Sequence, residues 1–237
     1  MSDKPSVRSP WFWVPSLYFA QGIPYVAVMI VSVLMYKRLG VSNTDIALYT
    51  SWLNLPWVIK PFWSPFVDLL KTKRWWVATM QLLIGAGLAG VAFTIPTTFF
   101  FQASLAVFWL LAFSSATHDI AADGFYMLAL DSHEQAFFVG IRSTFYRIAI
   151  IAGQGVLVMF AGFLENSTGN IPLAWSVTFF ILGGLFLALF LYHRYILPLP
   201  KGDKPSATVT PSTILKEFFA TFASFFKKKQ AFVAILF

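Results

Sequence analysis

The sequence contains no cysteine and few charged residues. The absence of Cys among the 237 residues excludes disulfides, thiolate nucleophiles and cysteine-based metal sites from this chain. Only 11% of the residues are Asp, Glu, Lys or Arg, whereas a soluble domain carries about 25%. Hydrophobic residues make up 58% instead, and the mean hydropathy is +0.70. The chain therefore has lipid rather than water as its main solvent.

Six apolar runs are long enough to cross a bilayer, since a helix needs about 20 apolar residues to do so. They lie at 12–36, 46–69, 75–95, 99–130, 136–162 and 173–197. The sequence therefore predicts an all-α membrane protein, with a six-helix transmembrane bundle over residues 1–197. No signal peptide is expected, because the short polar N-terminus leads into the first run without a small-residue cleavage site.

Basic residues lie between the apolar runs and give the chain a net charge of +7. They do not form a basic patch on a soluble domain, which favours a membrane surface over nucleic acid as the partner. With the N-terminus inside, most of them fall on the inner side, whereas Lys37 and Arg38 fall on the outer side. The positive-inside rule thus predicts a multi-pass protein of the cytoplasmic (inner) membrane with a cytoplasmic N-terminus.

Residues 198–230 are predicted to be a cytoplasmic linker that ends in an amphipathic helix. The linker begins with Pro and Lys, and the later Phe residues fall on one helical face beside a Lys cluster. Residues 231–237 read as the start of another transmembrane helix. Because the sequence stops seven residues into this run, we expect the chain to be truncated.

One glycine motif satisfies a nucleotide-binding pattern without its structural context. Residues 85–90 (GAGLAG) match G-x-G-x-x-G, but no strand precedes them. Small residues at these spacings let membrane helices approach closely. We interpret the motif as a helix-packing surface and predict no cofactor.

Ionisable residues inside the runs are the main candidates for function. Each costs about 2.5–3.5 kcal/mol to insert at mid-bilayer, and such residues mark functional sites by default. They are Lys60, Asp119, Asp123, Arg142 and Arg147. Asp119 and Asp123 lie one turn apart on one helical face. The alternative is that these residues form structural ion pairs between helices, and Arg142 has the further option of snorkelling to the interface.

Two other functions remain open from the residues alone. His118 and the adjacent Asp119 could form the acid–base pair of a membrane-embedded transferase. Together with Asp123, they could instead form part of a metal site. Only His133 and Glu134 lie near to support either chemistry, so we predict neither an enzyme nor a metal site. The other hypothesis is that the chain is a truncated half of a membrane protein and transports no solute.

Three segments carry a resemblance to a known family. Residues 55–68 (LPWVIKPFWSPFVD) are similar to the second-helix pattern L-P-x-x-x-K-x-x-W-[AS]-P-x-x-D of AmpG-like muropeptide permeases. Residues 116–123 (ATHDIAAD) resemble the fourth-helix pattern A-[ST]-x-D-I-x-x-D, and residues 19–24 (FAQGIP) the first-helix F-x-x-G-[LI]-P. These permeases form a branch of the major facilitator superfamily that also holds acetyl-coenzyme A transporters.

The resemblance implies the N-terminal half of a secondary active transporter and the start of its seventh helix. It further implies proton-coupled uptake of a muropeptide-like or other anionic solute by alternating access, with a C-terminal six-helix half as partner. The implied site residues are Gln21, Tyr25, Lys60, Arg142, Tyr146 and Arg147 for substrate binding, Asp119 and Asp123 for proton coupling, and Asp68 and Arg74 for gating.

Overall fold

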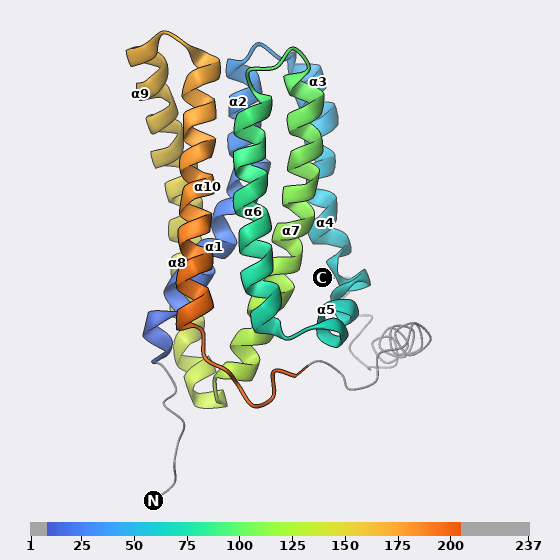
Figure 1. Ribbon diagram of the computed structural model, residues 1–237, viewed down its shortest axis with the longest axis vertical. Helices are drawn as coiled ribbons and strands as arrows, with labels where there is room; N and C mark the ends of the chain where they lie inside the picture. Colours follow the sequence, from blue (N-terminus) through green and yellow to red (C-terminus); the bar gives the residue numbers. More distant parts are fainter. Residues whose placement is uncertain (1–8, 205–237) are drawn as a thin grey trace, which may run out of the picture.

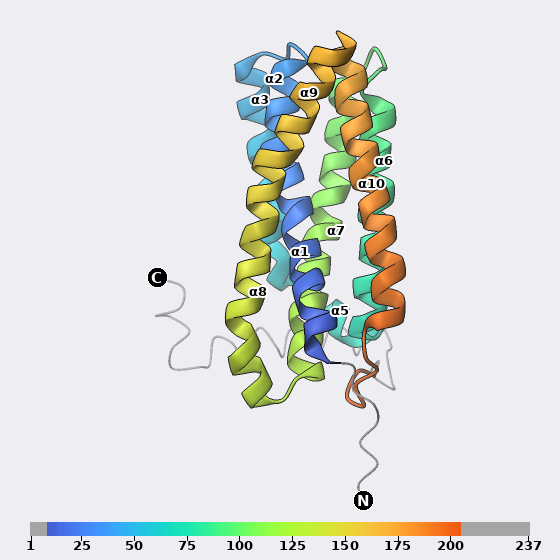
Figure 2. The same ribbon diagram turned by 90° about the vertical axis from the view of Figure 1, so that its left-hand side faces the viewer.

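The computed structural model describes residues 9–204, which form an elongated bundle of helices with no strand among them. Figures 1 and 2 show the helices running roughly parallel to the long axis of the bundle. The all-α membrane architecture predicted from the sequence is confirmed. The predicted amphipathic helix within 205–230 and the predicted start of a seventh span at 231–237 lie outside the described residues.

Five of the six predicted runs form helices that are long and apolar enough to cross a membrane. The first, Pro10–Arg38, consists of η1 (Pro10–Phe12), α1 (Val14–Val26), one π segment η2 (Ala27–Val31) and α2 (Ser32–Arg38). The others are α6 (Lys73–Thr94), α7 (Phe100–Ala129), the continuous α8 (Ser132–Ala152), η5 (Gly153–Leu157) and α9 (Val158–Thr168), and α10 (Ile171–Ile196).

The second predicted run is a series of short helices rather than one long helix. It comprises α3 (Asn43–Thr50), η3 (Ser51–Asn54), α4 (Leu55–Ile59), η4 (Lys60–Phe62) and α5 (Ser64–Leu70). A proline stands in the first turn of each of the last three: Pro56, Pro61 and Pro65. Proline lacks the backbone N–H and fixes φ, so each one starts a new helical segment. Figure 1 shows the series running along one side of the bundle.

Helix α6 packs between α10 and α7 through the glycine motif. A Cβ at Gly85 would lie 3.2 Å from the Gly183 carbonyl oxygen of α10. A Cβ at Gly87 would lie 2.7 Å from Leu111 Cδ2 of α7. The two helices can approach α6 this closely only because these positions lack side chains. The helix-packing interpretation of residues 85–90 is confirmed.

Helices α1 and α8 form the other close contact of the bundle. A Cβ at Gly22 would lie 2.7 Å from Ala149 Cβ and 2.9 Å from the Tyr146 carbonyl oxygen. One turn of π-helix follows each of these helices, and Gly153 at the start of η5 packs against Val26. Turns of π-helix occur frequently at functional sites. This contact brings the polar residues of α1 and α8 to the same side of α7.

Candidate functional site

Lys60 and Asp119 meet inside the bundle, from two elements far apart in sequence. Asp119 lies on α7 and is 7% exposed. The Lys60 Nζ lies 3.9 Å from Asp119 Oδ2, and its side chain is 37% exposed. Lys60 reaches this position because the proline-interrupted series places it between α4 and α5. The pair is open on the lysine side and buried on the aspartate side.

Polar groups whose bonding capacity is unused surround this carboxylate. Four of the buried polar atoms that lack a hydrogen-bond partner among the described residues are Oδ1 of Asp119, Oε1 of Gln21, Nε1 of Trp57 and Oγ of Ser115. Gln21 and Trp57 lie beside the Asp119 carboxylate. A buried polar group without a partner costs about 1–3 kcal/mol. Such a concentration at one place indicates a site that receives a polar ligand or a proton.

Two tyrosines complete this part of the bundle. Tyr146 of α8 lies near both Asp119 and Tyr25, close enough for electrostatic interaction. The Tyr25 ring packs edge-on against Trp57, with the ring centroids 5.2 Å apart. Four of the residues predicted for binding or coupling, Gln21, Tyr25, Lys60 and Tyr146, therefore gather around Asp119.

Asp123 and Arg142 form a second cluster, one helical turn from Asp119. The Tyr18 hydroxyl donates to Asp123 Oδ1 at 2.9 Å and accepts from Arg142 Nη1 at 3.1 Å. Arg142 Nη1 lies 3.5 Å from Asp123 Oδ1. The guanidinium also lies over the rings of Tyr18 and Tyr126, at 4.9 and 5.1 Å. These groups satisfy one another, so Arg142 is held by partners rather than snorkelling.

The remaining predicted residues lie elsewhere. Arg147 is exposed on α8, and no hydrogen bond or ion pair joins it to another described residue. Asp68 pairs with Lys73, at the end of the bundle where α5 leads into α6. Arg74 donates a hydrogen bond to the backbone oxygen of Arg194. The structure therefore gathers Asp68 and Arg74 at one end of the bundle, away from Asp119.

His118 faces away from Asp119, into a buried hydrogen-bonded chain that links four helices. His118 Nε2 lies 3.1 Å from Gln81 Nε2. Gln81 Oε1 lies 3.0 Å from His193 Nδ1, and His193 Nε2 lies 2.9 Å from Ser16 Oγ. The two histidines and Gln81 are fully buried. This chain joins α7, α6, α10 and α1.

The other acidic and histidine side chains bear on the alternative of a transferase or metal site. Between residues 9 and 204, no three His, Asp or Glu side chains come together to hold a metal ion. Glu134 is engaged in a capping box with Asp131 at the start of α8.

Several residues of this structure were not among the predicted site residues. Trp57 lies three positions before Lys60, so helical spacing alone would have placed it on the same side. Gln81 and His193 stand out as polar residues within apolar runs. No sequence signal pairs Glu165 with Arg38, because their contact joins helices that are distant in the chain.

Comparison with protein families identifies the chain. Residues 19–234 match the model of the BT1 family. The chain belongs to the BT1 family. This match covers most of the sequence, including the first-, second- and fourth-helix motifs.

Individual relatives agree with the predicted resemblance to AmpG-like permeases, which is confirmed. The chain is 27% identical over 234 residues to the putative transporter AmpG 4 of Rickettsia conorii, covering 93% of this chain and 53% of the relative. It is 24% identical over 228 residues to the anhydromuropeptide permease of Escherichia coli strain K12, covering 93% of this chain and 43% of the relative. The chain spans about half the length of the curated relatives it matches.

Proposed function

We propose that the chain forms the N-terminal half of a secondary active transporter that takes up an anionic, muropeptide-like solute together with a proton. A C-terminal six-helix half completes the transporter, and substrate binds between the halves. Membership of the BT1 family and the printed names of the relatives support the transport class. The observation that carries the proposal is the incompletely satisfied Lys60–Asp119 pair.

The pair is suited to coupling solute transport to proton transport, because Lys60 is partly exposed whereas Asp119 is buried. Lys60 is partly exposed and offers a cation to an anionic group of the solute. When the solute engages Lys60, the buried Asp119 carboxylate loses its counter-charge. Desolvation and the loss of a nearby cation both favour the neutral form of a carboxyl group. Asp119 therefore takes up a proton as the solute binds, and both are carried together.

The neighbouring groups have supporting roles in this mechanism. Gln21 and Tyr25 of α1 and Tyr146 of α8 supply hydrogen-bonding groups to the solute near Asp119. Arg142 and Asp123 form a neutral pair one turn away. Opening that pair would present a second cation to the solute and a second acceptor to the proton. We assign Asp68 to gating through its ion pair with Lys73.

The decisive experiment neutralises each member of the pair in the full-length gene product. Lys60→Met and Asp119→Asn are each expected to abolish uptake of a labelled anhydromuropeptide while leaving abundance in the membrane close to normal. Neutralising either residue also lowers its insertion cost, so lost activity would not reflect poorer burial. Uptake and abundance are measured in the same membranes.

The double variant separates this function from a purely structural ion pair. A structural pair that loses one member leaves the other buried without a partner, which reduces abundance, and the double neutral variant restores it. Under our proposal the double variant is abundant and inactive. A double variant that transports normally would refute the proposal.

We further propose an inner-membrane location with the N-terminus in the cytoplasm. Figure 1 places the N-terminal end, α5 and the end of α10 at one end of the bundle, where Lys71 is exposed. Thr98 is exposed at the opposite end, between α6 and α7. In a cysteine-free background, Thr98→Cys should label with an impermeant thiol reagent in intact cells and Lys71→Cys should not. Labelling of position 71 from outside would invert the topology.

A further inference from the structure

The continuous helix formed by α8, η5 and α9 is the least buried of the five described spans. Only 22% of an 18-residue apolar stretch of this helix is buried, against 67% for the first span. Figure 2 shows the helix along the outside of the bundle, next to α1. Ala149 of α8 is fully buried against Gly22 of α1. The side of α8 opposite Ala149 is therefore left open by the described residues.

This open side of α8 carries polar residues. Arg147 is two positions from the buried Ala149, so a helix of 3.6 residues per turn places the two on opposite sides. Ser143, one turn before Arg147, and Gln154, two turns after it, are also exposed. Arg147 lies near the middle of the 37-residue helix Ser132–Thr168, and no hydrogen bond or ion pair joins it to another described residue. A charged side chain at this depth in a span is costly to expose to lipid.

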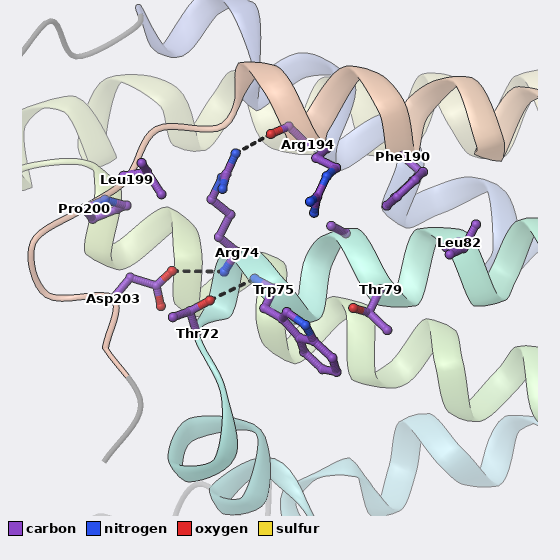
Figure 3. Close-up of a pocket in the computed structure, with 11 residues that line it drawn as sticks. Thr72, Arg74, Trp75, Thr79, Leu82, Phe190, Arg194, Leu199, Pro200 and Asp203 are labelled. Atoms are coloured by element: carbon purple, nitrogen blue, oxygen red, sulfur yellow. Dashed lines mark hydrogen bonds between the residues drawn. The ribbon is translucent and has the colours of Figure 1, made fainter. Parts of the chain in front are cut away.

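The exposed surface of α6 and α10 has a different composition. The exposed side chains in the middle of these two helices are apolar, as in Leu82, Leu83, Phe93, Phe180, Ile181 and Leu187. Figure 3 shows Leu82 of α6 and Phe190 of α10 in the pocket between the two helices, on its apolar side. Apolar side chains are compatible with lipid, whereas an unpaired arginine is not. The two sides of the bundle therefore have different neighbours in the membrane.

The neighbour of α8 is a stretch of chain that the relatives contain beyond the part matched here, since the match covers only 53% and 43% of their lengths. On the basis of the transport function proposed above, in which a second half completes the protein, we propose that this half covers the open side of α8 and places an Asp or Glu against Arg147. A carboxylate accepts two hydrogen bonds from one guanidinium, and the pairing offsets the cost of burying both charges. Arg147 then holds the two halves together, in place of the solute-binding role that the family resemblance implied.

The first test cross-links the two halves of the full-length gene product in the membrane. A protease site is inserted after Ala207, and Ile151 is replaced by the photoreactive p-benzoylphenylalanine. Ile151 lies one turn from Arg147 and is 70% exposed. After irradiation and cleavage, we expect the two halves to remain in one band on a denaturing gel. The matched control places the photoreactive residue at Ile181 of α10, which is 50% exposed, and its two halves should separate.

Cross-linking of position 151 to lipid, or to a second copy of the protein, without joining the two halves would overturn the proposal. This measurement does not require uptake. Its result is therefore independent of whether Lys60 and Asp119 couple solute to protons.

The second test reverses the charge at position 147 in the same cleavable protein, without the photoreactive residue. Arg147→Glu places like charges against each other, so the amount of the second half that co-purifies after cleavage should fall roughly tenfold. Arg147→Lys keeps the charge and should lower it much less. Lys201→Glu is the control, because Lys201 is exposed at the end of the bundle and outside α8, and it should have no effect.

A charge exchange identifies the partner of Arg147. Each Asp and Glu within the apolar runs of the second half is changed to Arg in the Arg147→Glu background, and one of these changes should restore co-purification. If none does, and Arg147→Gln raises the KM for uptake while the halves stay together, Arg147 binds the solute and the proposal is overturned.

Discussion

Two carboxylates of this bundle have the same exposed fraction, yet their surroundings differ. Glu165 and Asp119 are each 7% exposed. Glu165 Oε2 accepts from Arg38 Nε at 2.9 Å, and Oε1 accepts from Trp175 Nε1 at 2.7 Å. Asp119 has Lys60 at 3.9 Å, and its Oδ1 has no hydrogen-bond partner among residues 9–204.

The difference shows that burial of a charge does not by itself identify a functional group. Glu165 uses both oxygens to hold α2, α9 and α10 together. Both Glu165 oxygens accept hydrogen bonds within the fold, as expected of a structural group. Asp119 keeps capacity for a further partner, and Lys60 remains partly exposed. Unused hydrogen-bonding capacity, rather than the exposed fraction, distinguishes the candidate site.

The largest expected effect on stability comes from neutralising the structural carboxylate. Glu165→Gln removes the ionic component of two hydrogen bonds at once, so the melting temperature should fall by roughly 5 °C. Asp119→Asn removes a charge that the fold satisfies poorly, so its melting temperature should be unchanged or raised. Thermal unfolding of the two purified full-length variants measures this.

The effects of these two substitutions on uptake should be the reverse of their effects on stability. Uptake per folded molecule should persist in Glu165→Gln and be lost in Asp119→Asn. If Asp119→Asn instead unfolds at the lower temperature and retains uptake, the roles that we assign to the two carboxylates are reversed.

The same substitution can be made at one tryptophan in each region. Trp175→Phe removes the donor to Glu165 and should cost about 1.5–3 kcal/mol of unfolding free energy, the value of a hydrogen bond to a charged group. Trp57→Phe removes an N–H that has no partner among the described residues, so its cost should be much smaller. Trp57→Phe should instead raise the KM for uptake several-fold. Equal destabilisation by both substitutions would contradict the comparison.

Much of the fold follows from sequence patterns that depend on single segments. Apolar run length predicts the spans, and the glycine spacing of residues 85–90 predicts close helix packing. The sequence predicts a single span over the second run, whereas the structure has five short elements there. Proline positions show where a helix is weakened, whereas the neighbours that stabilise each short segment are set by tertiary contacts.

The site was predictable only in part, because its geometry depends on contacts between distant segments. Placing Lys60 and Asp119 in membrane runs identified them as candidates, and the structure brings them together. Sequence gave no means of separating Asp119 from Glu165, or of seeing that His118 turns toward Gln81. Both distinctions depend on which face of a helix packs against which neighbouring helix. A local pattern in a single sequence does not show these contacts.

A smaller effect is expected where α1 supports the site against α8. Gly22→Ala places a methyl group 2.7 Å from Ala149 Cβ and 2.9 Å from a backbone oxygen, so the helices must separate. Overpacking of this kind costs about 1–3 kcal/mol. Uptake should fall with stability, because Gln21 moves with α1. Gly162→Ala is the control, since a Cβ there meets nothing within 4 Å. Comparable destabilisation by Gly162→Ala would show a general intolerance of alanine.

The smallest effect is expected at Tyr18, whose hydroxyl connects Asp123 to Arg142. Tyr18→Phe leaves the 3.5 Å contact between the two charged groups but removes both hydrogen bonds of the hydroxyl. We expect a cost of about 0.5–1.5 kcal/mol and a change in uptake of a few-fold, as Asp123 and Arg142 become easier to separate. Tyr126→Phe is the matched control, because its ring also faces Arg142 while its hydroxyl donates to the Gln135 carbonyl oxygen. It should destabilise the protein to a similar degree and leave uptake per folded molecule unchanged. Equal changes in uptake for both variants would mean that the tyrosine rings, rather than the Tyr18 hydroxyl, position Arg142.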